Sequence, residues 1–234
     1  MNAESAWLPP GAWDACADES LNIEQFLGKP CWIGVDLASK IDIASIVALF
    51  PHENGYAVFP KFYLPRAAVE NGGNNASAYA GWESGGHLTV VAGEVLDFDS
   101  VIDDLLLWIG QFDVQEVVLD PWKAVHITNP LQKRGVTVPL IEVSQNVKNL
   151  SGPMKEVEAL VVSRRLKHDG NPAFGWMASN VVCHTDVNGN VFPRKEHVWA
   201  KIDGIVATIT AMSRAMLMRI VTSVYEKRGL LLLP

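Results

Sequence analysis

Three aspartates stand at positions from which their carboxylates could gather around bound metal ions. Asp36 and Asp120 each end a short apolar run, and Asp203 opens a long segment with helical apolar periodicity. Carboxylates at the ends of adjacent strands, faced by a third from a packed helix, can hold hard cations such as Mg²⁺ or Mn²⁺. Two such ions bridged by aspartates can drive in-line hydrolysis of a phosphodiester. The three residues therefore predict the catalytic site of a nuclease that uses two divalent metal ions.

Each aspartate also has a simpler structural explanation. Asp36 could be an ordinary strand-end residue, and Asp120 precedes Pro121, a pair that commonly opens turns. Asp203 could only favour a helix N-terminus electrostatically. An unpaired carboxylate between apolar neighbours on a central strand is costly, however, which favours a metal-binding role for Asp36. Asp42 follows Asp36 after one short loop and would face the same end of the sheet, so it is a further candidate metal ligand.

Basic residues cluster at two places in the sequence. Arg194 and Lys195 form one cluster together with nearby Lys201, and residues 164–167 contain the other. Such clusters could follow a phosphate backbone, and the first predicts contacts with double-stranded DNA. The alternative for each is a solvated charged face. Lys201 stands two residues before Asp203, where it could neutralise the acidic cluster or touch a scissile phosphate, or simply be a solvated lysine.

Length and composition limit the class of protein. The chain has 234 residues, of which 49% are hydrophobic and 19% charged, and this suits one globular domain with appendages. Three cysteines without CxxC spacing argue against structural zinc or a disulfide framework and favour a reducing cytosol. The N-terminus lacks a signal-peptide pattern, and no apolar run approaches the roughly 20 residues that span a bilayer. We therefore expect no membrane association.

The net charge bears on the expected partner. A formal charge of -7 argues against a generic DNA-coating protein, which would be basic. It does not exclude a nuclease, because bound metal ions would cancel part of the acidity.

Apolar patterns indicate which elements must position the aspartates. Five segments have the composition and length of strands: residues 32–37, 43–50, 56–64, 117–119 and 136–143. Asn54-Gly55 is a strong hairpin signal between the second and third strands. The loop of residues 38–42 is too short for a parallel crossover, so the first two strands must be antiparallel.

Helical periodicity marks the segments between and after these strands. We expect helices over residues 98–112 and 122–134, one that starts at residues 151–153, and a last one over 202–218. Residues 180–195 predict a β-hairpin that turns at Asn188-Gly189. Because the hairpin comes directly before the helix of Asp203, its base should lie near the metal site while its tip projects.

These elements indicate an α/β protein with a mixed five-stranded sheet flanked by helices and an added β-hairpin. Three antiparallel strands followed by alternating helices and strands match the ribonuclease-H-like fold by analogy. In that fold the first and fourth strands lie side by side at the centre of the sheet. Asp36 and Asp120 would then be neighbours despite their distance in the sequence.

Four separated blocks resemble one protein family in the family's order. They are CWIGVDLASKIDIASIVALF, VVLDPWKA, GNPAFGWMASNVV and KIDGIVATITAMSRA, and they resemble the nuclease domain of the large terminase subunit of tailed bacteriophages. The resemblance runs from about Pro30 to about Met216, and the lead-in around Trp7, Trp13 and Cys16 resembles the end of the family's linker between ATPase and nuclease. We therefore expect a linker over residues 1–29, a nuclease domain over 30–218 and a C-terminal tail over 219–234.

The resemblance implies an endonuclease that cuts concatemeric viral DNA at the start and end of capsid filling. Asp36, Asp120 and Asp203 would be its catalytic metal ligands, the family usually has an acid at the position of Asp42, and Asn180 recurs in a family block. The implied partners are double-stranded DNA, the portal protein, the small terminase subunit and the packaging ATPase domain. The implied location is the host cell cytoplasm rather than the mature virion.

The packaging ATPase of this family needs a phosphate-binding GxxxxGK[ST] loop. The sequence contains no such motif. We therefore expect this chain to be the nuclease half alone.

Three other classes of protein compete with this interpretation. Gly34-Val-Asp36 resembles the first phosphate loop of actin-like ATPases, but Ala38-Ser39-Lys40 follows in place of phosphate-cradling residues, and the chain is too short for both halves of that fold. A Holliday-junction resolvase or transposase would share fold and chemistry, and the terminase blocks decide against it. A non-enzymatic binding module would be favoured if any of the three core acids were missing, and none is.

Overall fold

The first three predicted strands form the antiparallel half of a mixed sheet. The computed structural model describes residues 3–37, 42–71 and 73–227. Strand β2 (Pro30–Leu37) pairs antiparallel with β3 (Ala44–His52), and β3 pairs antiparallel with β4 (Gly55–Pro65). The predicted meander is thus confirmed. Most of the loop between β2 and β3, residues 38–41, lies outside the described residues.

The parallel half of the sheet joins the meander at β2. Strand β6 (Asp113–Leu119) pairs parallel with β2, and β7 (Leu140–Glu142) pairs parallel with β6. The expected adjacency of the first and fourth predicted strands is therefore confirmed. β6 is longer than predicted and β7 shorter, since only three residues of the predicted fifth strand find a partner.

Two short strands that the sequence did not indicate extend the sheet from five strands to seven. β5 (Thr89–Val91) and β8 (Leu166–His168) both pair parallel with β4, one near each end of its free edge. The order within the described residues is β5-β4-β3-β2-β6-β7, with β8 beside β4. Strands of three residues carry no periodicity of their own, and pairing with the long β4 accounts for them.

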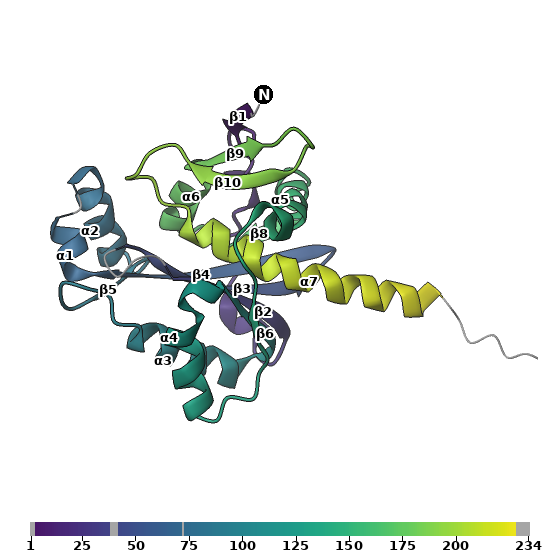
Figure 1. The fold of residues 1–234 in the computed structure, drawn as a ribbon, viewed down its shortest axis with the longest axis horizontal. Coiled ribbons are helices and arrows are strands. Elements are labelled where there is room, and N and C mark those ends of the chain that lie inside the picture. Colours follow the sequence, from purple (N-terminus) through teal and green to yellow (C-terminus); the bar gives the residue numbers. More distant parts are fainter. Residues whose placement is uncertain (1–2, 38–41, 72, 228–234) are drawn as a thin grey trace, which may run out of the picture.

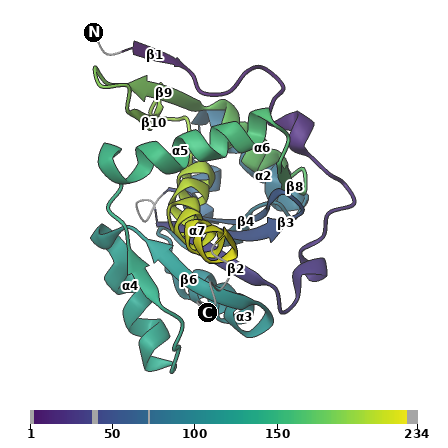
Figure 2. The same ribbon diagram turned by 90° about the vertical axis from the view of Figure 1, so that its right-hand side faces the viewer.

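Helices cover both faces of this sheet (Figure 1). On one face lies α7 (Asp203–Lys227), with α5 (Val147–Val162) and α6 (Pro172–Ser179) packed on it. On the other face lie α3 (Asp99–Gln111) and α4 (Pro121–Lys133). Figure 2 looks almost along α7 and shows it between α5 and the central strands. The sheet thus separates two apolar cores, one on each face.

A second, small sheet contains the predicted hairpin. Strands β9 (Val181–Thr185) and β10 (Val191–Lys195) are antiparallel, and β1 (Ala3–Ala6) pairs with the outer side of β9. Gly189 has a φ of 75°, which glycine adopts without strain, so the predicted turn is confirmed.

The hairpin tip does not project freely, which corrects the expectation from sequence. The Nζ of Lys155 on α5 donates a hydrogen bond to the carbonyl oxygen of Gly189 at 2.7 Å. The backbone N–H of Val191 donates to Oγ of Ser151 at 3.0 Å. The sequence pattern of the hairpin could not reveal this docking, because the partner residues lie 34 and 40 positions earlier in the chain.

Helix α5 begins four residues earlier than the expected Ser151. The side chain of Asn146 accepts a hydrogen bond from the N–H of Asn149 and caps the helix there, so Pro153 lies inside the helix rather than in its first turn. A good N-cap outweighs the one intrahelical hydrogen bond that proline cannot donate.

The sequence predicted no element between β4 and the helix expected at residue 98, yet helical turns lie there. α1 (Arg66–Glu70), η3 (Gly73–Asn75) and α2 (Ala76–Ser84) follow β4 in succession. α6 was not predicted either.

The ends of the chain are more structured than a linker and a tail suggest. Two 3₁₀ turns, η1 (Asp14–Cys16) and η2 (Ile23–Phe26), follow β1, and Trp7, Trp13 and Cys16 are buried in the core beneath α5 and α6. At the other end α7 continues to Lys227, while residues 228–234 of the expected tail lie outside the described residues. The division into linker, domain and tail stays a prediction. None of the described helices is long and apolar enough to cross a membrane.

Candidate metal centre and nucleic-acid cleft

The alternation of side chains along β2 aims Asp36 at helix α7. Ile33 and Val35 belong to the core on the α3 and α4 side, and Trp32 belongs to the core on the α7 side. Successive residues of a strand point to opposite faces, so Gly34 and Asp36 share the face of Trp32. Asp36 is therefore the last residue of β2 that faces α7 before the chain leaves the sheet.

Gly34 lets α7 approach β2 closely enough to bring Asp203 near Asp36. A Cβ atom on Gly34 would lie 1.9 Å from the carbonyl oxygen of Ala207, so only glycine fits there. Asp203 precedes Ala207 by one helical turn, about 6 Å along the axis. Asp36 follows Gly34 by two residues, about 6.6 Å along the strand. The helix runs antiparallel to β2, so Asp36 and Asp203 lie at the same end of the contact between β2 and α7.

Asp120 reaches this end from the neighbouring strand. Val35 and Leu119 are partners in the parallel pairing of β2 with β6, so Asp36 and Asp120 are the next residues on adjacent strands. Asp120 is also the N-cap of α4, where its Oδ1 accepts a hydrogen bond from the N–H of Trp122 at 2.8 Å. Its Oδ2 accepts from the N–H of Gln145 at 3.0 Å. Two backbone donors thus fix the orientation of this carboxylate.

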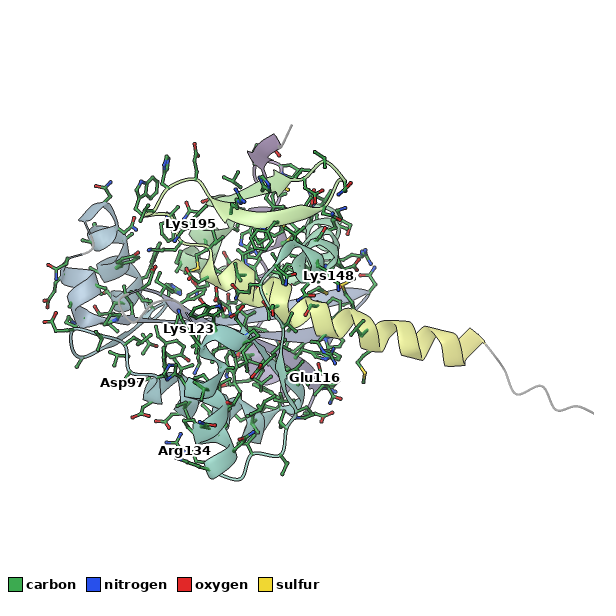
Figure 3. The ribbon with its side chains drawn as sticks, viewed as in Figure 1. Asp97, Glu116, Lys123, Arg134, Lys148 and Lys195 are labelled. Carbon is green, nitrogen blue, oxygen red and sulfur yellow. The ribbon has the colours of Figure 1, made fainter. Side chains whose placement is uncertain are left out.

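The aspartates meet in one cleft of about 470 Å³ at the carboxyl end of the central strands. Its polar and aromatic lining consists of Asp36, Asp42, Asp120, Trp122, Lys123, Gln145, Lys195 and Asp203. All four acids singled out from the sequence are among them. In Figure 3, Lys195 on β10 and Lys123 on α4 lie on either side of the first turns of α7.

The other two basic residues predicted from the sequence lie beside this cleft rather than in its lining. The Nζ of Lys201 pairs with the Asp42 carboxylate at 2.8 Å, and both residues line a second cavity of about 520 Å³. Arg194 lines a third cavity, under the hairpin, that shares Asp36, Lys195 and Asp203 with the main cleft. Asn180, which recurs in a family block, donates a hydrogen bond from its side-chain amide to the carbonyl oxygen of Lys201 at 3.1 Å.

Sequence reasoning missed three residues of the cleft. The amide of Gln145 donates to Oδ1 of Asp36 at 3.1 Å, and Lys123 donates to the carbonyl oxygen of Leu37. Trp122 and Lys123 lie within one of the family blocks, directly after Asp120-Pro121. Gln145 follows the carboxyl end of β7, where parallel strands place their functional loops, and that rule could have indicated it.

Burial and the repulsion of nearby charges raise the pKa of two carboxylates of this cleft, those of Asp36 and Asp203. Burial, with smaller contributions from Asp120 and Asp42, raises the pKa of Asp36 to about 6, although the Gln145 amide and Lys123 oppose the shift. Burial, followed by the charges of Asp36 and Asp42, raises the pKa of Asp203 to about 8. Concentrated, desolvated negative charge of this kind is compensated well by a divalent cation.

The donor set fits a hard cation, although the side chains are not drawn together around one. Carboxylate oxygens are the ligands that Mg²⁺ and Mn²⁺ prefer. Yet within residues 3–37, 42–71 and 73–227 no three His, Cys, Asp or Glu side chains are already arranged to hold a metal ion. Asp42 is engaged by Lys201, and both oxygens of Asp120 accept backbone hydrogen bonds. An ion bound at Asp42 would have to displace the Lys201 ammonium that pairs with this carboxylate.

The raised pKa of Asp203 predicts how stability depends on pH without metal. A carboxyl whose pKa rises on folding contributes stability below its unfolded pKa of about 4 and loses it as the pH passes its folded pKa. In EDTA, we expect Asp203→Asn to stabilise the chain at about pH 8.5 by about 2 kcal/mol, roughly 4–8 °C in Tm, and to leave it nearly unchanged at about pH 5. Thermal melts at the two pH values measure this, and a loss of stability at both would make Asp203 a structural residue.

Comparison with known proteins assigns the chain to a family. The family described as "Terminase large subunit, endonuclease domain" matches residues 1–218. Protein YmfN of Escherichia coli (strain K12) is 36% identical over 243 residues, which cover 98% of this chain and 51% of that protein. The terminase large subunit of Enterobacteria phage HK97 is 26% identical and covers 92% of this chain and 42% of that protein. The chain thus spans about half the length of these curated relatives.

Solved structures show the same fold. The large terminase of bacteriophage HK97 superposes with a TM-score of 0.82 at 24% identity, over 91% of this chain and 44% of that one. The large terminase nuclease of the thermophilic phage G20c superposes with a TM-score of 0.53 at 13% identity, over 79% of this chain and 82% of that one. The predicted ribonuclease-H-like architecture is therefore confirmed. Because the family match covers nearly all of the sequence, this chain belongs to the endonuclease domains of terminase large subunits.

Proposed function

We propose that this domain is a divalent-metal-dependent endodeoxyribonuclease that cuts concatemeric viral DNA during genome packaging. The observation that carries the proposal is the convergence of Asp36, Asp120 and Asp203 from β2, the end of β6 and α7 in one cleft. Three elements far apart in the sequence place acids at one point. Burying these carboxylates costs free energy, and a purely structural role would give no interaction that offsets the cost. Membership of a terminase nuclease family supports the same activity.

Asp36, Asp120 and Asp203 would hold two ions, Mg²⁺ or Mn²⁺, and Asp42 would complete their coordination. When bound, divalent ions activate a water molecule for attack on phosphorus and stabilise charge on the attacking and leaving oxygens. The backbone donors at Asp120 fix its carboxylate beforehand, while each of its oxygens keeps a lone pair for coordination. Gln145 orients Asp36 in the same way through its amide.

The cations around the cleft would position the DNA backbone. Lys195 lines the cleft itself, and Lys201 and Arg194 line the cavities that adjoin it on either side. A phosphate held by Lys195 would lie beside the aspartates, and each further contact would add a salt-dependent increment to affinity. Base-specific contacts are not needed for this arrangement, so we expect little sequence preference.

The other components of the packaging machinery are inferred from the family. The relatives are about twice as long as this chain, and we propose that their additional half corresponds to the packaging ATPase. The portal protein and the small terminase subunit would be the other partners. The site of action would be the host cell cytoplasm.

Metal dependence is the direct test of the proposed activity. We expect supercoiled plasmid to be nicked and linearised when it is incubated with the domain and Mn²⁺ or Mg²⁺, and to remain intact in EDTA, because the aspartates cannot activate water alone. Agarose gels taken over time measure the cleavage. Restoring Mn²⁺ in excess over EDTA is the control for irreversible inactivation. Cleavage that continues unchanged in EDTA would overturn the proposal.

A further inference from the structure

The strongest unexplained feature near the cleft is the indole of Trp122. It is 90% exposed, although the other large aromatic residues of the chain are mostly buried. An exposed tryptophan has an apolar body in water and contributes nothing to the cores on either side of the sheet. Trp122 is also among the residues that line the carboxylate cleft, so a ligand bound in that cleft would lie beside it.

The backbone of Trp122 is held rigidly beside the aspartates. Its N–H donates to Oδ1 of Asp120 at 2.8 Å, and it occupies the first turn of α4 directly after Pro121. Both features fix the backbone position of Trp122 relative to the cleft. A ligand group bound at Asp120 would therefore lie at a constant distance from the attachment point of the indole.

The chemistry around Trp122 selects the ligand. The same cleft presents two cations, Lys123 and Lys195, together with the acids. Cations beside an exposed aromatic ring are the combination that binds a nucleic-acid strand, since phosphates pair with the cations while a sugar or base packs on the ring. If the scissile phosphate lies at the aspartates, the adjoining nucleotide must lie against this lining.

We propose that Trp122 is a DNA-contacting residue that packs its indole against the deoxyribose next to the scissile phosphate. This inference rests on the proposed nuclease function and adds to it a contact that is apolar and independent of base identity. Every nucleotide of a duplex offers an accessible deoxyribose, whatever its base, so the contact suits an enzyme that cuts without reading sequence. The contact involves no charged group, so the salt dependence of binding distinguishes it from the contacts of Lys195.

The test is DNA binding under conditions that do not allow cleavage. The probe is a fluorescein-labelled duplex of arbitrary sequence in Ca²⁺, and fluorescence anisotropy gives Kd at several salt concentrations. We expect Trp122→Ala to weaken binding by about tenfold and Trp122→Phe by much less, because the phenyl ring retains an apolar face that can pack on a sugar. The salt slope should not change for either variant. Lys195→Ala should lower that slope by about 0.9, because one phosphate contact is lost.

Val125→Ala is the matched control. Val125 is 54% exposed on the same helix but is not among the residues that line the cleft, so its variant should bind DNA like the wild-type chain. Equal affinity of Trp122→Ala and Val125→Ala would overturn the inference and assign the indole to a protein contact. A lowered salt slope in Trp122→Ala would also overturn it, since the residue would then act through the cations. A wild-type chain that binds no duplex would instead overturn the proposed function itself.

Discussion

Replacing Asp36, Asp120 or Asp203 singly with asparagine is expected to slow DNA cleavage in Mn²⁺ by about a thousandfold or more. In the proposed mechanism each change would remove an anionic ligand from a metal site that contributes several kcal/mol of transition-state stabilisation, and every 1.36 kcal/mol corresponds to a factor of ten in rate. Asparagine keeps the size and shape of the side chain, so the cleft itself should persist. Initial rates of plasmid nicking measure the effect.

Asp103→Asn is the control for these variants. Asp103 is exposed on α3, on the face of the sheet away from α7, and it is absent from the lining of the cleft. Its variant should cleave DNA at the wild-type rate. Calorimetric titration with Mn²⁺ and thermal melts together separate the possible causes of a lost activity. Loss of a ligand weakens metal binding, whereas a structural defect lowers Tm. Near-normal cleavage by all three aspartate variants would mean that the reaction occurs elsewhere.

Gly34→Ala should be among the most destabilising single substitutions in the domain. The added methyl group would lie 1.9 Å from the carbonyl oxygen of Ala207 and 3.0 Å from the backbone nitrogen of Ala211, so α7 would have to move away from β2. Overpacking against backbone atoms costs about 3 kcal/mol, which corresponds to a fall in Tm of roughly 6–12 °C for a chain of this size. Denaturant and thermal unfolding measure this change.

The same displacement should impair the cleft, because Asp203 is carried by the first turn of α7. Gly110→Ala is the matched control. Gly110 lies within α3, where a Cβ would meet nothing within 4 Å, and alanine there should be neutral or stabilise by up to about 1 kcal/mol. If Gly34→Ala and Gly110→Ala were equally stable, the close approach of α7 to β2 would not be a requirement of the fold.

The sequence alone determined the centre of the sheet and the place of two aspartates. Asn54-Gly55 and the short loop before β3 dictate an antiparallel meander, since neither allows a crossover. These inferences hold because strand direction and side-chain parity are local properties. The place of β6 beside β2, and with it Asp120 beside Asp36, came from analogy with the ribonuclease-H-like fold, and the observed pairing confirms it. The metal-binding roles of the aspartates stay a prediction.

The tertiary structure alone decided what surrounds the aspartates. Gln145 reaches Asp36 from 109 residues away, and Lys201 reaches Asp42 from 159 residues away, so no spacing rule links either pair. The docked hairpin tip and the short strands β5 and β8 depend likewise on distant partners, which supply hydrogen bonds that three to five residues cannot provide for themselves. The exposure of Trp122 also depends on the tertiary structure, because burial is a property of packing. The sequence shows only that a tryptophan follows Asp120-Pro121.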